Sequence, residues 1–271
     1  MRRTRGAWPR KITRPAAVAL AATLAVGCYQ LRPSAEKRRA QKDAAAAAAT
    51  ELHAAIYDYV QETLYTYPQL ATRHGMHVYE LPQGDEVDLD RELPNYSTDL
   101  VSARIDSLWA TLDRLDRKAP AEALSTSDQA DRGVLVDAIE LELVRLEAEA
   151  EHRHSPLAHA SALAEAIYFP LVIEYAPEEE RLADVLGRLN WIPAYAERAA
   201  KTLEDGSAPE TEAARDLVAL TASLVREELD ARIPNKGELR SSYESMKKPV
   251  LAALADLEEL FAERLPEKGE R

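Results

Sequence analysis

The stretch PEEERLADVLGRL, residues 177–189, determines how the fold of this chain is interpreted. Proline fits the first turn of a helix, and the three glutamates after it complement the positive end of the helix dipole. The apolar residues then recur at the i, i+3, i+4, i+7 spacing of one helix face: Leu182, Val185, Leu186 and Leu189. This stretch therefore predicts an amphipathic helix, and Pro193 predicts a kink before it ends near Glu204.

The rest of the chain has the same character. Only 9 of 271 residues are glycine, runs of strand-forming residues are absent, and Ala, Leu and Glu dominate. The sequence predicts an all-α fold, a bundle of about seven or eight helices with no sheet. The other predicted helices cover approximately residues 44–65, 98–117, 125–153, 156–168, 210–232 and 238–264.

Apolar residues at helical spacing predict which face of each helix points inward. The predicted inward residues are Leu100, Ile105, Leu108, Leu112 and Leu115; Leu135, Ile139, Leu143 and Leu146; Leu217, Leu220, Leu224 and Val225; and Val250, Leu254, Leu257 and Phe261. Ser125 and Asp128 predict a capping box at a helix start. The last helix has heptad-like spacing over barely two heptads, which favours a bundle helix over a coiled coil.

Residues 78–97 interrupt the helical periodicity and are rich in acids and prolines. Asp88, Asp90 and Glu92 alternate as calcium ligands can, but Pro94 follows them and no glycine stands at the turn. The stretch therefore does not match the EF-hand pattern. We expect a solvated acidic loop.

The N-terminal segment has the features of a secretory leader. Six basic residues and no acid precede a short apolar run, residues 15–27, which is too short to span a bilayer. Gly27 and Cys28 follow, and this boundary resembles the lipobox of bacterial lipoproteins, although Leu24 lies one place earlier than usual. The resemblance implies cleavage before Cys28, the only cysteine, and a diacylglyceryl group on its sulfur. The alternative is an ordinary signal peptide with a chance cysteine.

The leader sets the expected organisation and location of the protein. We expect a lipoprotein signal peptide at residues 1–27, a polar tether at 28–43 and a helical domain at 44–271. Tyr29, in place of an aspartate, favours the outer membrane or the periplasmic face if the cell has two membranes. The membrane, reached through the lipid on Cys28, is the one partner that the sequence indicates directly.

Charge argues against one class of partner. Loss of residues 1–27 removes six of the 34 basic residues and none of the 47 acidic ones, so the mature chain has a net charge of about −19. Such a surface repels phosphate backbones, and we expect no nucleic-acid partner. A chain with one cysteine can form no internal disulfide, so an exported fold must be held by its core alone.

No complete set of catalytic residues is present in the sequence. The histidines lack the His-Glu-x-x-His spacing of zinc enzymes, and we expect surface or capping roles for them: His74, His77, His152, His154 and His159. The paired carboxylates Glu140, Glu142, Glu147 and Glu149 indicate the solvated face of a helix. We expect no catalytic residue, no metal ligand and no cofactor in this chain.

Three stretches together resemble the N-terminal half of the bacterial family called domain of unknown function 885. The first is Tyr67-Pro68-x-x-Ala71-Thr72-x-x-Gly75-Met76-His77 with Leu93-Pro94-Asn95-Tyr96-Ser97. The second is Ser125-x-x-Asp128-Gln129-Ala130-Asp131 with Leu135 and Ile139-Glu140. The third comprises Pro156-Leu157, 176–182, Arg188-Leu189-x-x-Ile192-Pro193 and Thr211-Glu212-x-Ala214. The order and spacing of the stretches fit the family from residue 55 to about residue 265.

The resemblance implies an exported, helix-rich, often lipidated protein. Members are typically about twice this length, and their second half carries a His-Glu-x-x-x-x-His-like zinc motif that makes them metallopeptidase-like. This sequence stops at Arg271, before that half, so we expect no zinc ligand here and no activity from this chain alone. If the activity implied for full-length family members were present, it would be metal-dependent peptide hydrolysis.

Two hypotheses follow. In the first, the chain is the non-catalytic N-terminal half of such an enzyme, with a complementary C-terminal half as its partner. In the second, it is a binding or scaffold lipoprotein whose partner is another protein of the cell envelope. An intact hydrolase with an unfamiliar site is a third reading, which the empty motif search disfavours.

Overall fold

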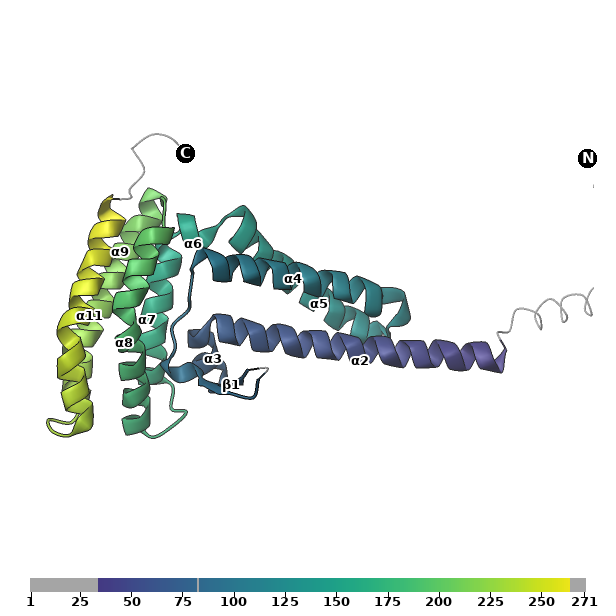
Figure 1. The fold of residues 1–271 in the computed structure, drawn as a ribbon, viewed down its shortest axis with the longest axis horizontal. Coiled ribbons are helices and arrows are strands. Elements are labelled where there is room, and N and C mark those ends of the chain that lie inside the picture. Colours follow the sequence, from purple (N-terminus) through teal and green to yellow (C-terminus); the bar gives the residue numbers. More distant parts are fainter. Residues whose placement is uncertain (1–33, 82, 264–271) are drawn as a thin grey trace, which may run out of the picture.

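The computed structural model describes residues 34–81 and 83–263 and is helical over most of that length (Figure 1). The longer helices are α2 (Ala35–Thr66), α4 (Thr98–Lys118), α5 (Thr126–Leu143), α7 (Pro156–Val172), α8 (Glu178–Thr202), α9 (Ala208–Ser223) and α11 (Glu238–Glu263). The short elements are α3 (Pro68–His74), α6 (Glu151–His154), α10 (Leu229–Arg232), the 3-10 turns η1 (Leu89–Arg91) and η2 (Ala121–Ala123), and the π turns η3 (Val144–Ala148) and η4 (Leu224–Glu228). The all-α prediction is confirmed.

The expectation of no sheet is wrong in one place. Within the expected acidic loop, β1 (Val78–Glu80) pairs antiparallel with β2 (Glu86–Asp88), and Tyr79 lies opposite Val87. Gly84 turns the chain with a φ of 90°, a conformation that glycine adopts without steric cost. Three-residue strands are too short to show a period of two clearly, and this is why the sequence pattern did not reveal them.

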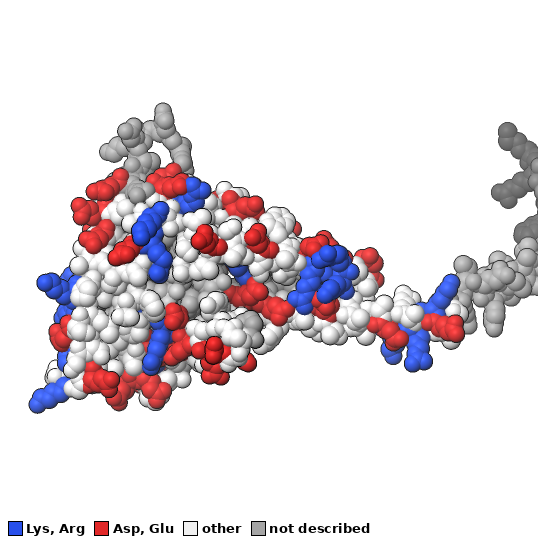
Figure 2. Space-filling view, viewed as in Figure 1, with Lys and Arg blue, Asp and Glu red and all other residues white. Residues whose placement is uncertain are grey.

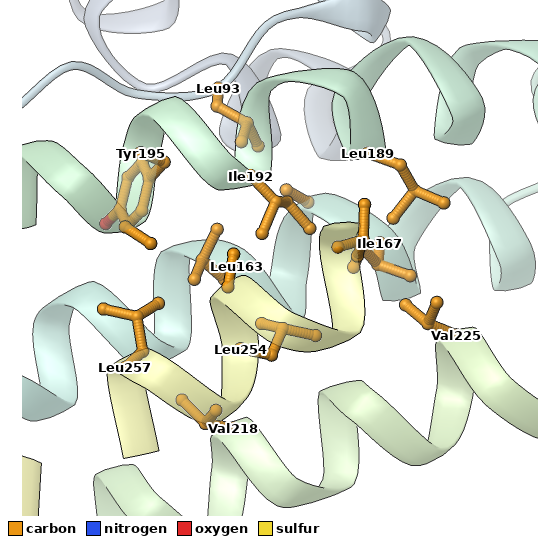
Figure 3. Close-up of a cluster of buried hydrophobic side chains, with 14 of the residues drawn as sticks. Leu93, Leu163, Ile167, Leu189, Ile192, Tyr195, Val218, Val225, Leu254 and Leu257 are labelled. Carbon is orange, nitrogen blue, oxygen red and sulfur yellow. The ribbon is translucent and has the colours of Figure 1, made fainter. Parts of the chain in front are cut away.

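The C-terminal bundle, which we define as α7, α8, α9 and α11, encloses the larger hydrophobic core (Figure 3). Apolar side chains from all four helices meet there, and the predicted α11 face of Val250, Leu254, Leu257 and Phe261 is fully buried. The predicted start at Pro177 is confirmed, because α8 begins at the next residue. Leu220 was expected inward but is exposed, since Val218 and Thr221 take the buried positions of α9.

The N-terminal lobe, which we define as α2, α4 and α5, has a separate core. Figure 1 shows these helices running across the C-terminal bundle rather than along it. The core includes Leu52, Leu108, Leu115 and Ile139, so most predicted faces are confirmed. Ser125 caps α5 as predicted, because its Oγ accepts a hydrogen bond from the Asp128 amide.

Two predicted helices are interrupted. The helix expected over 125–153 ends in η3, after which Ala150 adopts the left-handed conformation with a φ of 46°. The helix expected over 210–232 contains η4. Pro170 does not end α7, which continues to Val172. Each interruption keeps an apolar face inward, so the faces could be predicted where the breaks could not.

The first described residues extend α2 beyond the sequence prediction. Ser34 caps the helix through the Lys37 amide, and helix begins at Ala35 rather than at residue 44. Part of the expected tether, residues 35–43, is therefore helical and exposed. The predicted leader and Cys28 lie outside the described residues.

Candidate functional site

A groove lies where the N-terminal lobe meets the C-terminal bundle. We call it the junction groove; its volume is about 620 Å³, in the range of small-molecule and peptide sites. The end of α2, the start of α4, the middle of α8 and the segment after η1 form its walls. The side chains that dominate the lining are apolar or aromatic: Tyr65, Tyr67, Leu93, Tyr96, Leu100 and Trp191.

Large apolar side chains remain exposed on the rim of the junction groove. Tyr65 is 44% exposed, Leu100 51% and Trp191 41%. Tyr65 is held by stacking on Tyr79, with ring centroids 4.6 Å apart. Leu100 was predicted to face the lobe core and does not, because Val101 takes the buried position at the start of α4. Exposed apolar groups beside a concavity are typical of a binding surface.

Two opposite charges line the groove without a partner in the described chain. Glu92 forms no ion pair or side-chain hydrogen bond there, and burial, with a contribution from Asp88, raises the pKa of its carboxyl. Arg198 forms no ion pair there either, and its Nε is buried without a hydrogen-bond partner. Both residues are half-buried, and a buried polar atom such as Arg198 Nε is normally satisfied, so these two side chains indicate where a ligand or a partner chain would bind.

Beside the groove, Arg104 forms a buried ion network that ties the N-terminal lobe together. Only 6% of Arg104 is exposed; its Nε and Nη2 donate to Glu142 at 2.9 Å, and its Nη1 donates to Glu62 at 2.9 Å. Tyr67 adds a hydrogen bond to Glu142, and burial raises the pKa of its hydroxyl. The expectation of a solvated Glu142 is wrong, whereas Glu140, Glu147 and Glu149 are exposed as expected.

A second buried network fixes the hairpin and η1 to the C-terminal bundle. Arg188 is fully buried and donates to the Ala166 carbonyl at 2.7 Å and the Leu89 carbonyl at 3.1 Å. Desolvation lowers the pKa of its guanidinium. Gly187 lets η1 approach α8, because a Cβ there would lie 2.8 Å from the Arg91 side chain.

Asp90 is at the centre of this second network. It accepts a hydrogen bond from the Thr72 hydroxyl at 2.6 Å and pairs with His77 Nδ1 at 2.7 Å. The expectation of a fully solvated acidic loop is therefore wrong at Asp90, and His77 is a structural partner rather than a simple surface residue. A nucleophilic triad needs histidine to contact the hydroxyl, but here the carboxylate separates them and Thr72 is buried.

The remaining predicted histidines are not gathered into one site. His159 is 1% exposed, which contradicts the expected surface role; its Nε2 lies 2.9 Å from the His152 carbonyl, and its Nδ1 lies 3.2 Å from the Tyr195 hydroxyl. Burial lowers the pKa of His159 to about 4. His152 is also buried, His154 pairs with Asp205, and His74 is exposed at the end of α3.

The described residues do not fit a zinc ion. Within 34–81 and 83–263, no group of three or more His, Cys, Asp or Glu side chains could hold a metal. A structural zinc site takes four protein ligands and a catalytic site three. In the same ranges, no helix combines the length and apolar character that crossing a membrane requires.

Sequence reasoning gave no role in this site to the charged residues that distinguish it, namely Arg104, Arg188, Glu92 and Arg198. One signal was available for two of them. Arg104 stands four residues after Leu100 and four before Leu108, and Arg188 stands three after Val185, so each interrupts an otherwise apolar face. A charge at such a position indicates a buried pair, although it does not identify the partner.

Comparison with known proteins places the chain in a family. A structure from Shewanella oneidensis, titled as that of a "putative lipoprotein of unknown function", aligns with a TM-score of 0.62 and 17% identity. The alignment covers 80% of this chain but 38% of the other, and at this identity it shows the fold alone. No curated protein matches the sequence. The family described as bacterial protein of unknown function, DUF885, matches residues 68–271, three quarters of the chain, and the chain belongs to that family.

Proposed function

We propose that this protein is an exported lipoprotein, anchored through Cys28, whose helical domain binds a partner and performs no reaction alone. The junction groove carries the proposal: it combines an exposed apolar rim with the unpartnered charges of Glu92 and Arg198. In the two polar networks behind it, most polar atoms pair within the chain, Arg188 Nε being an exception, and neither network contains an activated nucleophile. Recognition, rather than chemistry, is what this arrangement supports.

The first candidate partner is a complementary C-terminal half. The alignment with the Shewanella protein leaves most of that longer chain unmatched. In this proposal the other half supplies the zinc motif of a metallopeptidase-like enzyme, and this chain forms one wall of the substrate cleft. We assign no step of peptide hydrolysis to the residues described here.

A second candidate function is that of an envelope scaffold with no catalytic ancestry in use. The observation that favours it is the C-terminal bundle, whose four helices supply most of the larger apolar core. Solution behaviour separates the two candidates. A monodisperse mature chain favours the scaffold, and aggregation through the exposed rim favours an incomplete half.

The binding experiment first requires the DNA sequence next to the gene of this protein. A neighbouring reading frame that encodes His-Glu with a later histidine would supply the complementary half, whose affinity for the mature chain is then measured by calorimetry. We expect Glu92→Gln with Arg198→Gln to weaken binding by about tenfold or more, because both charges lose their partners. The exposed control pair Glu140→Gln with Lys201→Gln should leave the affinity unchanged.

Two results would contradict parts of the proposal. If the control pair weakened binding as much as the groove pair, the groove would not be the binding surface. Zinc-dependent peptide hydrolysis by this chain alone would overturn the non-catalytic role. The anchor is tested separately, by the intact mass of the protein from the membrane fraction, which should include acyl chains on Cys28.

A further inference from the structure

The first turns of α2 project from the body of the protein as a free helix (Figure 1). We call residues 34–47 the basic stalk. Residues 34–44 are exposed, and Ala48 is the first buried residue of α2. At 1.5 Å per residue, the basic stalk is about 20 Å long. Because it packs against little else, the exposed side chains of Lys37, Arg39 and Lys42 are available for a partner outside the described chain.

The charge of the basic stalk is opposite to that of the rest of the mature protein. It carries four bases, Lys37, Arg38, Arg39 and Lys42, and two acids, Glu36 and Asp43. At about 100° per residue, the four bases span roughly 200° of the helix surface and both acids lie in the remaining arc. Figure 2 shows blue and red side chains on this projecting segment, apart from the body of the protein.

Three of the four bases of the basic stalk are unpaired, whereas several bases of the neighbouring lobe form ion pairs. Lys37, Arg39 and Lys42 form no ion pair among residues 34–81 and 83–263. On the neighbouring lobe, by contrast, Arg114 pairs with Glu51 and Asp58, and Arg132 pairs with Asp116. Three unpaired bases, Lys37, Arg39 and Lys42, on an otherwise acidic protein indicate an anionic partner.

The position of the basic stalk in the sequence identifies that partner. Six residue steps separate Cys28 from Ser34, so the chain between them can span at most about 20 Å. A lipid on Cys28 therefore holds the basic stalk close to the membrane surface, where fields extend about 8–10 Å at physiological ionic strength. One acyl chain holds a protein only marginally, and a basic segment is a common second contribution.

We infer that the basic stalk binds the headgroups of anionic phospholipids and holds the acidic body away from the bilayer. This inference rests on the proposed anchor at Cys28 for the stalk's position in the cell, but its lipid affinity can be measured without that assumption. A base close to an anionic membrane surface increases partitioning by about fivefold. Three or four such contacts, partly offset by repulsion of the body, should give a gain of tenfold or more.

Because Cys28 is the only cysteine, an acyl chain can be attached at one defined position. The mature chain, residues 28–271, is coupled through Cys28 to one synthetic acyl chain, so the result does not depend on whether cells lipidate it. Partitioning is measured on vesicles of phosphatidylcholine alone and of phosphatidylcholine with phosphatidylglycerol. We expect about tenfold tighter binding to the anionic vesicles at low salt, and loss of that gain at high salt.

Charge-matched variants assign the effect to the basic stalk. Replacing Lys37, Arg38, Arg39 and Lys42 together by glutamine should abolish the gain while keeping the helix, because glutamine is a good helix former. Replacing the exposed bases Lys201, Arg226, Lys236 and Lys248 by glutamine makes the same net change and should preserve the gain.

Three outcomes would overturn the inference. These are equal partitioning of the native chain on both vesicles, an equal loss in the two variants, and binding to soluble polyphosphate without a gain on anionic vesicles. Failure of the proposed anchor has a different signature, namely a native intact mass without acyl chains. The lipid contact and the anchor can therefore fail independently.

Discussion

The C-terminal bundle and the junction between the lobes are stabilised by different forces. In the bundle, side chains such as Leu189, Ile192 and Leu254 bury apolar surface against one another. At the junction, the buried guanidinium groups of Arg104 and Arg188 hold separate segments through directional hydrogen bonds. The first kind of contact can be weakened in small steps. The second leaves an uncompensated buried charge when one partner is removed.

This difference bears on function, because the junction is where the groove is formed. The position of Glu92 and the rim depends on the hairpin and η1, and Arg188 ties these to α7 and α8 through carbonyl groups. The bundle can therefore stay folded while the groove loses its shape. The following predictions separate the two regions.

The largest expected effect is that of Arg188→Leu. The change removes donors to the Leu89 and Ala166 carbonyls and leaves Asp90 with less compensation, so the free energy of unfolding should fall by about 4 kcal/mol. The bundle control, Ile192→Val, should cost about 1 kcal/mol. Urea unfolding measures both. Amide exchange should also show residues 78–96 losing protection ahead of α11 in the Arg188 variant alone; equal loss in both regions would break the comparison.

Arg104 and Glu142 should contribute to the free energy of unfolding as a coupled pair. Arg104→Met alone should destabilise the protein by about 3 kcal/mol, because Glu142 is left buried without its partner. Adding Glu142→Leu removes the orphaned charge and should recover most of the loss. A double-mutant cycle from urea unfolding gives the coupling energy. Additive losses would mean that the two side chains act independently, contrary to the hydrogen bonds between them.

The same contrast explains what could be predicted from sequence. Helix α11 has its apolar residues at regular spacing, so its buried face could be identified residue by residue. Arg188 also lies on a regular face, but its acceptors Leu89 and Ala166 come from distant segments, and periodicity carries no information about them. This tertiary contact holds η1, which follows β2, against α8. The junction groove could not be predicted from periodicity either, because it is formed where two separately predictable lobes meet.

One ionisable group in the C-terminal bundle should make its stability depend on pH. The pKa of His159 falls from its usual 6.5 to about 4 in the folded protein, so the unfolded chain binds the proton more tightly. Its stabilising contribution is complete above pH 6.5 and is lost as the pH falls toward 4. Between pH 7 and pH 5 the loss should be about 2 kcal/mol.

Thermal unfolding of His159→Gln as a function of pH checks this assignment. The variant should lose much of the slope between pH 7 and pH 5. An unchanged slope in His159→Gln would assign the pH dependence to other groups. His152, whose pKa burial also lowers, is the next candidate.

The smallest effect should be a gain in stability at the edge of the N-terminal lobe. Ala150 joins η3 to α6 with a positive φ, a conformation that costs a residue with a Cβ about 1 kcal/mol relative to glycine. Ala150→Gly should therefore stabilise the protein by up to about 1 kcal/mol in urea unfolding, although the freer unfolded chain offsets part of this. Ala110→Gly, in the exposed middle of α4, should instead cost about 1 kcal/mol. Opposite signs for one substitution would show that the break after η3 is imposed by packing at the junction, since local preference alone favours a continuous helix there.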